Sequence, residues 1–286
     1  MNKLRDTELI ITKDGRIYHL NLKKNEIANN IILVGDPERV SQISKKFQII
    51  EYKIQHREFI THTGIYNKKR ISVISSGIGT DNIDIVINEI DALVNIDFKT
   101  RKINSTKKSL NIIRLGTSGS LNKDILVDSI IVSSYAIGFD GLAHFYKKNE
   151  IREKALEEIF IENTNWSNNH ARPYAVRASD NLLEKFQNFK QGITLTATGF
   201  YGPQARELRL ESSIKNIHSC IEKINYKKSK ITNLEMETSA LYFLGKSLGH
   251  NTLTICAVLG NRLTQNYSKD PKKIIDTLII KVLNTL

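Results

Sequence analysis

The sequence has few cysteines and no long apolar run. Two of its 286 residues are cysteines, Cys220 and Cys256, and neither lies in a C-x-x-C pair or in a cysteine and histidine cluster with metal-ligand spacing. This excludes a disulfide framework and favours a reducing compartment. Charged residues lie near the start of the chain, where a secretory signal needs apolar ones, and no uncharged stretch could cross a bilayer. We therefore expect a cytoplasmic protein with no membrane partner.

Linker-like segments are also missing. The chain has only 4 prolines, no hinge rich in glycine and serine, no internal repeat and no low-complexity stretch. Nothing therefore marks a domain boundary, and the 40% hydrophobic content supports a full core. We expect a single domain over residues 1–286, with an N-terminal extension at residues 1–18 and a polar surface excursion at residues 98–109.

Acidic residues are outnumbered by basic ones, and the formal net charge is +12. The lysines are scattered in pairs along the chain, whereas nucleic-acid-binding proteins usually gather them on one face. This favours a solvated surface with a general attraction for anions and no nucleic-acid partner. A nucleic-acid-binding role is an alternative that rests on charge alone, and it predicts an affinity that falls steeply with salt.

Strand and helix patterns alternate along the chain. Short runs of β-branched and apolar residues, most of them followed by glycine, predict buried strands at residues 31–34, 71–74, 112–115, 130–132, 193–195 and 252–258. Apolar residues at three- and four-residue intervals predict helices at residues 84–94, 151–161, 182–189, 236–248 and 274–286. The alternation predicts an α/β fold with a mixed central β-sheet flanked by helices, and ligand sites in loops at the carboxyl ends of strands.

Three of the expected strand-end loops combine glycine with side chains that suit phosphate: Gly35 to Arg39, Ser76 to Thr80 and Arg114 to Gly119. Glycine lets backbone N–H groups approach an anion, hydroxyl groups add donors, and a guanidinium group matches phosphate oxygens. Each loop alone is equally well explained as a tight turn. None forms a dinucleotide fingerprint, and the sequence has no P-loop motif.

Two further segments suit a nucleoside. Phe200 to Arg206 follows an expected strand and joins an aromatic ring to the amide of Gln204 and a guanidinium group. An amide can accept from a ring N–H and donate to a ring carbonyl, while arginine donates to a second carbonyl; uracil offers this edge and cytosine does not. Further on, Glu235 and Glu237 open an expected helix, where acids also occur simply because they favour a helix N-terminus.

Four motifs together carry a resemblance that covers about residues 19–262. They are Gly35-Asp36-Pro37-Glu38-Arg39-Val40, His56-Arg57-Glu58-Phe59, Arg114-Leu115-Gly116-Thr117-Ser118-Gly119 and Glu235-Met236-Glu237. Their order and rough spacing resemble the nucleoside phosphorylase superfamily, and the segment from Phe200 to Arg206 is similar to the uracil-binding signature of its uridine phosphorylases. The resemblance implies a pentosyltransferase of pyrimidine salvage that reversibly converts uridine and phosphate to uracil and ribose 1-phosphate.

The resemblance also implies which residues act, and in an active unit that is a homo-oligomer, either a dimer or a hexamer. Arg57 and His19 would reach the site of a neighbouring subunit. The expected phosphate ligands are Gly35, Arg39, Arg57, Arg114 and Thr117. The expected ribose contacts are Met236, Glu237 and His19, and the resemblance implies that His19 meets the 5′-hydroxyl in the site of the neighbouring subunit. The expected base contacts are Phe200, Gln204, Arg206 and Arg262. The catalytic groups would be Arg114, Arg206 and Gln204.

Inorganic phosphate would be the co-substrate, with no cofactor and no catalytic metal, and a monovalent cation between subunits stays open. The segment Leu259 to Arg262 stands where purine relatives carry a proton-donating aspartate, which favours a pyrimidine. Departures from the family pattern are the order of Gly202-Pro203 and the sequence Thr80-Asp81-Asn82. Alternatives on the same scaffold are a purine nucleoside phosphorylase, a nucleosidase, and a nucleoside-binding protein without activity.

Overall fold

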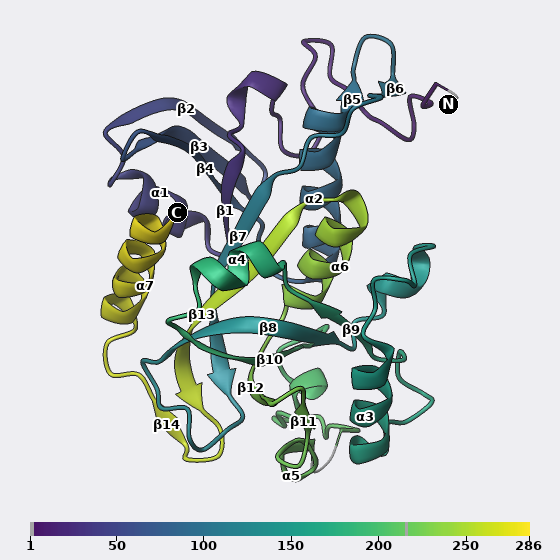
Figure 1. Ribbon diagram of the computed structural model, residues 1–286, viewed down its shortest axis with the longest axis vertical. Helices are drawn as coiled ribbons and strands as arrows, with labels where there is room; N and C mark the ends of the chain where they lie inside the picture. Colours follow the sequence, from purple (N-terminus) through teal and green to yellow (C-terminus); the bar gives the residue numbers. More distant parts are fainter. Residues whose placement is uncertain (1–2, 215–216) are drawn as a thin grey trace.

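One large mixed β-sheet runs through the molecule (Figure 1). The structure is a computed structural model that describes residues 3–214 and 217–286, and within these residues the sheet has twelve strands. Four parallel neighbours form one part of it, in the order β4 (Lys69–Ser75), β1 (Asn30–Val34), β7 (Asn111–Ser120) and β13 (Asn251–Asn261). Most residues of β1 and β7 are buried, as in strands that are covered on both faces.

Three more strands close part of this sheet into a ring. β13 pairs antiparallel with β8 (Ile130–Gly138), β8 runs parallel to β10 (Lys190–Thr196), and β10 runs parallel to β12 (Ser229–Glu235). β12 then pairs back onto β7, with Asn233 opposite Ser120 and Leu234 opposite Gly119. The carboxyl-terminal ends of β7 and β12 therefore meet, although they lie far apart in the sequence.

Shorter strands complete the sheet at its edges. β2 (Ile49–His56) and β3 (Phe59–Tyr66) form an antiparallel hairpin that pairs with β4. β9 (Tyr174–Arg177) pairs with β8, β11 (Asn225–Tyr226) with β12, and β14 (Asn266–Tyr267) with β13. A separate two-stranded sheet of β5 (Ile96–Asp97) and β6 (Lys102–Ile103) lies in and beside the polar excursion expected at residues 98–109.

Helices cover this sheet. The side chain of Asp36 caps α1 (Pro37–Ser44), and Pro37 occupies the first turn, where it costs no hydrogen bond. α2 (Thr80–Asn95) packs against α6 (Thr238–Leu248), which also packs on β8 and β13. The other α-helices of the described residues are α3 (Lys154–Thr164), α4 (Asp180–Lys185), α5 (Ile217–Ile221) and α7 (Pro271–Thr285). Short 3-10 turns lie at Lys24–Glu26, Leu142–Phe145 and Gly202–Gln204.

The architecture confirms the mixed α/β fold that the sequence predicts, but two local predictions are wrong. Residues 116–119 were expected in a loop, yet they continue β7 because β13 and β12 pair with them. The helix expected at residues 182–189 ends at Lys185. The next residue, Phe186, is fully buried, and β10 begins at Lys190. Residues 1 and 2 of the expected N-terminal extension lie outside the described residues.

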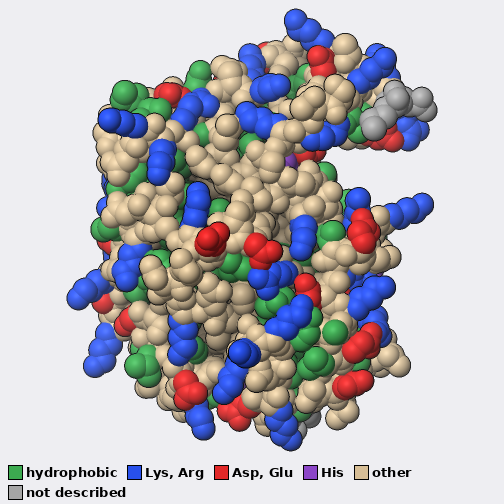
Figure 2. All heavy atoms as spheres, in the orientation of Figure 1, with side chains coloured by type: hydrophobic (Ala, Val, Ile, Leu, Met, Phe, Trp, Pro, Cys, Tyr) green, Lys and Arg blue, Asp and Glu red, His purple; other side chains and the backbone are tan. Residues whose placement is uncertain are grey.

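The surface shows no basic strip on the face drawn in Figure 2, where lysine and arginine side chains are spread over the upper and lower parts of the molecule. This agrees with the scattered lysine pairs of the sequence. In the described part of the chain, no helix combines the length and the apolar character that a membrane span requires.

Candidate active site

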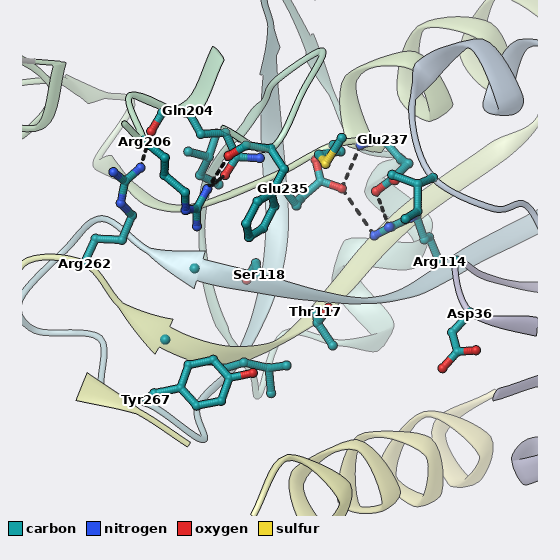
Figure 3. A pocket seen from close by; sticks show the side chains of 18 of the residues that line it. Asp36, Arg114, Thr117, Ser118, Gln204, Arg206, Glu235, Glu237, Arg262 and Tyr267 are labelled. Atoms are coloured by element: carbon teal, nitrogen blue, oxygen red, sulfur yellow. Dashed lines mark hydrogen bonds and ion pairs between the residues drawn. The ribbon is translucent and has the colours of Figure 1, made fainter. Parts of the chain in front are cut away.

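A cavity of about 1100 Å³ opens at the carboxyl ends of β1, β7, β12 and β13 (Figure 3). Sites at the carboxyl ends of strands are typical of α/β sheets. Most of the residues expected to bind phosphate, ribose or base meet here. Those that line the cavity are Gly35, Arg39, Arg114, Thr117, Phe200, Gln204, Arg206, Met236, Glu237 and Arg262. Their roles remain predictions, but the structure brings them together from distant parts of the chain.

Arg114 lies at one end of the cavity, on β7, with a side chain that is almost fully buried. It forms an ion pair with Glu237 and a second one, over 3.2 Å, with Glu235. Burial alone would lower the pKa of Arg114, but the two carboxylates outweigh burial and raise it. Its Nε and Nη1 atoms are buried and form no well-aligned hydrogen bond among the described residues, although Nη1 lies 3.2 Å from a carboxylate oxygen of Glu235. Arg114 therefore lines the cavity as a buried guanidinium group that is paired with two carboxylates.

The two glutamates beside Arg114 differ in how they are held. The carboxylate of Glu235 accepts from the backbone N–H groups of Glu237 and Thr238, each at 3.0 Å, and from the hydroxyl of Thr196 at 2.8 Å. This is the helix-start role that the sequence analysis left open. The carboxylate of Glu237 accepts from the backbone N–H of Gly79 at 2.8 Å and from Arg114. Burial raises the pKa of Glu237, although Arg114 opposes the shift.

Arg39 lies at the same end, in the first turns of α1, and donates from Nη1 to the carbonyl of Leu115 at 3.3 Å. Burial lowers its pKa, and Asp36 at 4.0 Å opposes this shift. Gly35 and Thr117 line the cavity close by, from the end of β1 and from β7. Guanidinium groups combined with a hydroxyl and an accessible backbone form a site that suits a phosphate ion.

Glycine makes room for these side chains. A Cβ atom at position 116 would lie 2.1 Å from Nη1 of Arg114 and 3.1 Å from Sγ of Cys256. Gly77 has a φ of +70°, and a Cβ atom there would lie 2.5 Å from Nδ2 of Asn82. The glycine at position 116 therefore permits the close approach of a guanidinium group to a strand, and the one at position 77 serves both a turn and a close contact.

Gln204, Arg206 and Arg262 form the other end of the cavity (Figure 3). Arg206 donates to the side-chain oxygen of Gln204 and, at 2.8 Å, to the carbonyl of Phe200, and its guanidinium carbon lies 3.9 Å from the centre of the Phe200 ring. Arg262 donates to the backbone carbonyl of Gln204 and, at 3.0 Å, to that of Ala205. Two arginines thus hold one buried glutamine.

This second end is positively charged. Neither Arg206 nor Arg262 forms an ion pair with a carboxylate of the described residues, and burial lowers the pKa of both, that of Arg262 to about 10. His218, on α5, is close enough to feel both charges: burial, followed by Arg262 and Arg206, lowers its pKa to about 4. Its ring nitrogens are buried and have no partner in the described part of the chain. A ligand that gains negative charge would be stabilised here.

His19 and Arg57 do not line the cavity. Arg57 donates from Nη2 to the hydroxyl of Tyr18 at 3.2 Å, and the rings of Tyr18 and His19 lie 4.8 Å apart. Glu58, the residue after Arg57, does line the cavity. The two residues therefore lie together on the surface near its margin. Their expected action in the site of a neighbouring subunit stays a prediction.

Several lining residues were not among the expected ligands. Glu58, Asn82 and Ser118 line the cavity and lie in motifs whose neighbouring residues were expected as ligands or formed part of a strand-end loop, so these neighbours were the sequence signal for them. Gln265 and Tyr267 follow β13 without any such signal. Among the described residues, no group of three or more histidine, cysteine, aspartate or glutamate side chains is arranged to hold a metal ion.

The sequence matches known proteins over most of its length. Residues 30–278 match the model of the phosphorylase superfamily. A uridine phosphorylase of Thermococcus kodakarensis is 28% identical over 95% of this chain and 88% of that protein, and a DeoD-type purine nucleoside phosphorylase of Clostridium novyi is 30% identical over 86% and 88%. A solved Trypanosoma brucei nucleoside phosphorylase, described as showing uridine phosphorylase activity, has a TM-score of 0.87 at 28% identity and covers 97% of this chain and 98% of its own. The chain therefore belongs to the phosphorylase superfamily and is an enzyme of that family.

Proposed function

We propose that this enzyme cleaves uridine with inorganic phosphate and forms uracil and ribose 1-phosphate. The Gln204–Arg206 pair carries the proposal. A guanidinium group only donates, so the Gln204 atom that it contacts is the side-chain oxygen, and the amide orientation is thereby fixed. The amide can then accept from N3–H of uracil and donate to one ring carbonyl, while Arg206 donates to the other.

Cytosine fits this arrangement poorly. Its unprotonated N3 would face the amide oxygen, and its exocyclic amine would face a donor, either the amide N–H group or Arg206, so that both contacts are mispaired. Because Gln204 is buried, water cannot repair the mismatch. Discrimination by such a site is worth about four to five decades in rate. Uridine is therefore the cleaved pyrimidine nucleoside that we expect.

A purine nucleoside is the second candidate, because a purine nucleoside phosphorylase is among the relatives. Asn261 belongs to the segment Leu259 to Arg262, where the family resemblance puts the proton-donating aspartate of purine enzymes. Its side chain donates to the carbonyls of Asn122 at 3.0 Å and Ile125 at 2.8 Å, and it accepts from the N–H groups of Leu263 and Thr264. The amide nitrogen of Asn261 thus donates twice and its oxygen accepts twice, and an amide is no acid that could protonate a leaving purine. This supports the pyrimidine assignment.

In the proposed reaction, phosphate bound by Arg39, Arg114 and Thr117 attacks C1′ while the bond from C1′ to N1 of uracil breaks. The electron pair of that bond stays with the base, next to Arg206 and the amide of Gln204. N1 of uracil then takes up one proton, which balances the proton that hydrogen phosphate loses when ribose 1-phosphate forms. No side chain forms a covalent bond, so catalysis is positioning of two reactants and stabilisation of the charge that develops on the base. The ribose hydroxyls would donate to Glu237, and the reaction needs no cofactor.

The test is an assay of purified protein with uridine, inosine and cytidine, each with and without phosphate. We expect uracil and ribose 1-phosphate from uridine only when phosphate is present, and little product from the other two nucleosides. Release without phosphate would identify a nucleosidase. Cleavage of inosine alone would assign the enzyme to the purine branch, and binding without cleavage would identify a nucleoside-binding protein.

We further propose that Arg57 and His19 complete the cavity of a second copy in a homo-oligomer, a dimer or a hexamer. Arg57→Ala and Arg114→Ala should each inactivate the enzyme. When the two variants are unfolded and refolded together, half of the sites in mixed pairs carry neither change. Activity should then return to roughly a quarter of the wild-type value by random pairing. Failure to recover any activity in the mixture would contradict the shared site.

A further inference from the structure

Glu89 holds His19 from a position on α2. Its carboxylate accepts from the backbone N–H of His19 at 3.0 Å and from that of Leu20 at 2.8 Å, and it lies 2.6 Å from Nδ1 of His19. The side chain of Glu89 is 12% exposed, whereas that of His19 is 30% exposed. A mostly buried carboxylate therefore fixes both the backbone and the ring of a histidine that reaches the surface.

These contacts decide which ring nitrogen carries a proton. A carboxylate only accepts, so the atom of His19 that faces Glu89 must be protonated, and Nδ1–H donates. In the neutral ring, Nε2 then has a free lone pair. Among the described residues, Nε2 has no hydrogen-bond partner. The neutral ring of His19, whose side chain is 30% exposed, thus retains an acceptor without a partner among the described residues.

A second contact fixes the same segment to the hairpin of β2 and β3. Nδ1 of His56 lies 2.9 Å from the backbone carbonyl of His19, and because the carbonyl accepts, this nitrogen is the donor. His56 immediately precedes Arg57, which contacts Tyr18. The backbone of His19 is therefore held from two sides, by Glu89 and by the strand that leads to Arg57.

We propose that Glu89 is a positioning residue, which fixes the Nδ1–H form of His19 so that Nε2 accepts a hydrogen bond from the 5′-hydroxyl of a nucleoside bound by a second copy of this chain. The proposal rests on the proposed function, because His19 has a substrate only if the cavity binds a nucleoside. It adds a group that does not touch the substrate itself. Replacement of Glu89 by glutamine should affect recognition of that one hydroxyl.

The first readout is the protonation of the ring. Histidine labelled with ¹⁵N in the full-length protein gives long-range ¹H–¹⁵N correlations that distinguish Nδ1–H from Nε2–H, and the signals of His19 are identified by their loss in His19→Ala. We expect Nδ1–H in the wild type and a shift toward Nε2–H in Glu89→Gln. A wild-type ring protonated at Nε2 would overturn the proposal.

The second readout is the ratio of kcat/KM for uridine to that for 5′-deoxyuridine. Glu89→Gln should lower this ratio roughly five- to tenfold, as the loss of one hydrogen bond does, and His19→Ala should lower it at least as much. The double variant should lose no more than His19→Ala alone. An unchanged ratio in Glu89→Gln, with both substrates slowed equally, would show a purely structural role.

Glu26→Gln is the matched control. Glu26 anchors the same N-terminal segment by binding Arg16 at 2.7 Å and the backbone N–H of Lys23 at 2.8 Å, and it does not contact His19. We expect lower thermal stability with an unchanged substrate ratio. An equal fall in the ratio would attribute the effect to general loosening and refute the proposal. If the wild type cleaves another nucleoside instead of uridine, the proposed function fails, and the ratio is measured with that nucleoside and its 5′-deoxy analogue.

Discussion

The two ends of the cavity hold arginines in opposite ways. Arg114 lies in a central strand, 4% exposed, and is paired with two carboxylates. Arg206 and Arg262 lie on connecting segments, are half-buried, and donate to uncharged oxygens. The first arginine is as much a part of the core as of the site, whereas the other two carry charge that the described residues do not neutralise. Stability and catalysis should therefore be coupled at one end and separable at the other.

Arg114→Ala should have the largest effect and should lower both stability and catalytic activity. It leaves two buried carboxylates without a counter-charge, so the free energy of unfolding should fall by about 3–5 kcal/mol in urea titrations. Turnover of uridine should fall roughly a hundredfold or more. Adding Glu237→Gln should recover part of the stability and none of the activity. Wild-type stability in Arg114→Ala would show that the ion pairs of Arg114 with Glu235 and Glu237 do not stabilise the fold.

Arg206→Ala should separate the two properties. We expect kcat/KM for uridine to fall roughly ten- to a hundredfold, because a charge-assisted hydrogen bond to the departing base is lost. The free energy of unfolding should fall by about 1–2 kcal/mol, less than in Arg114→Ala, because a neutral buried oxygen of Gln204 loses its donor and no buried charge is left unpaired. Near-normal turnover would refute the assignment of Arg206 to the base, and a large loss of stability would remove the contrast with Arg114.

Gly116→Ala perturbs the buried end without removing a charge. The added Cβ atom would collide with the guanidinium group of Arg114, so either the strand or the arginine must shift. The free energy of unfolding should fall by about 1–3 kcal/mol, as for other overpacked sites. The KM for phosphate should rise more than the KM for uridine. Equal changes in the two KM values would contradict a defect confined to the anion-binding end.

Acidification should destabilise the base end through His218, whose pKa is lowered mainly by burial and then by Arg262 and Arg206. Its pKa is about 4 in the folded protein, compared with the ordinary 6.5, so between these values the unfolded chain binds the proton more readily. This group therefore contributes a loss of stability as the pH falls from 6.5 toward 4. His218→Phe should reduce the fall in melting temperature over that interval. An unchanged slope would mean that His218 titrates normally.

The sequence predicts most of this site because its residues follow strands. Arg114 lies in a strong β-branched run, Arg39 follows such a run, and Glu237 lies at an expected helix start. The carboxyl ends of such strands meet in the fold. What each guanidinium group contacts could not be predicted in this way. The ion pairs of Arg114 and the hold of Glu89 on His19 depend on packing between elements that are distant in the sequence.

Predictions from local sequence patterns were also wrong or missing where glycine or polar residues lie in strands. The glycines after Arg114 resemble a turn, but the one at position 116 instead leaves space for that side chain. β12 was missed because Thr232 and Asn233 are buried in it, where they bond to neighbouring strands. The long hairpin of β2 and β3 was missed because most of the β2 residues are exposed or half-exposed. In each case the pairing with neighbouring strands, and not the local sequence pattern, determined the secondary structure.

The pairing of β12 with β7 limits how early the buried end of the cavity can form while the chain is being synthesised. The amide of Asn233 donates to the hydroxyl of Ser118 at 2.9 Å across 115 residues of chain, at the point where the ring closes. A nascent chain that has emerged only to the end of β10 already contains Arg39 and Arg114, but it lacks both glutamates that neutralise the buried arginine. Contacts of such long range form slowly. Residues up to Glu237 must therefore have emerged from the ribosome before the ion pairs of Arg114 can form, and products truncated before Glu235 should be inactive and sensitive to proteolysis.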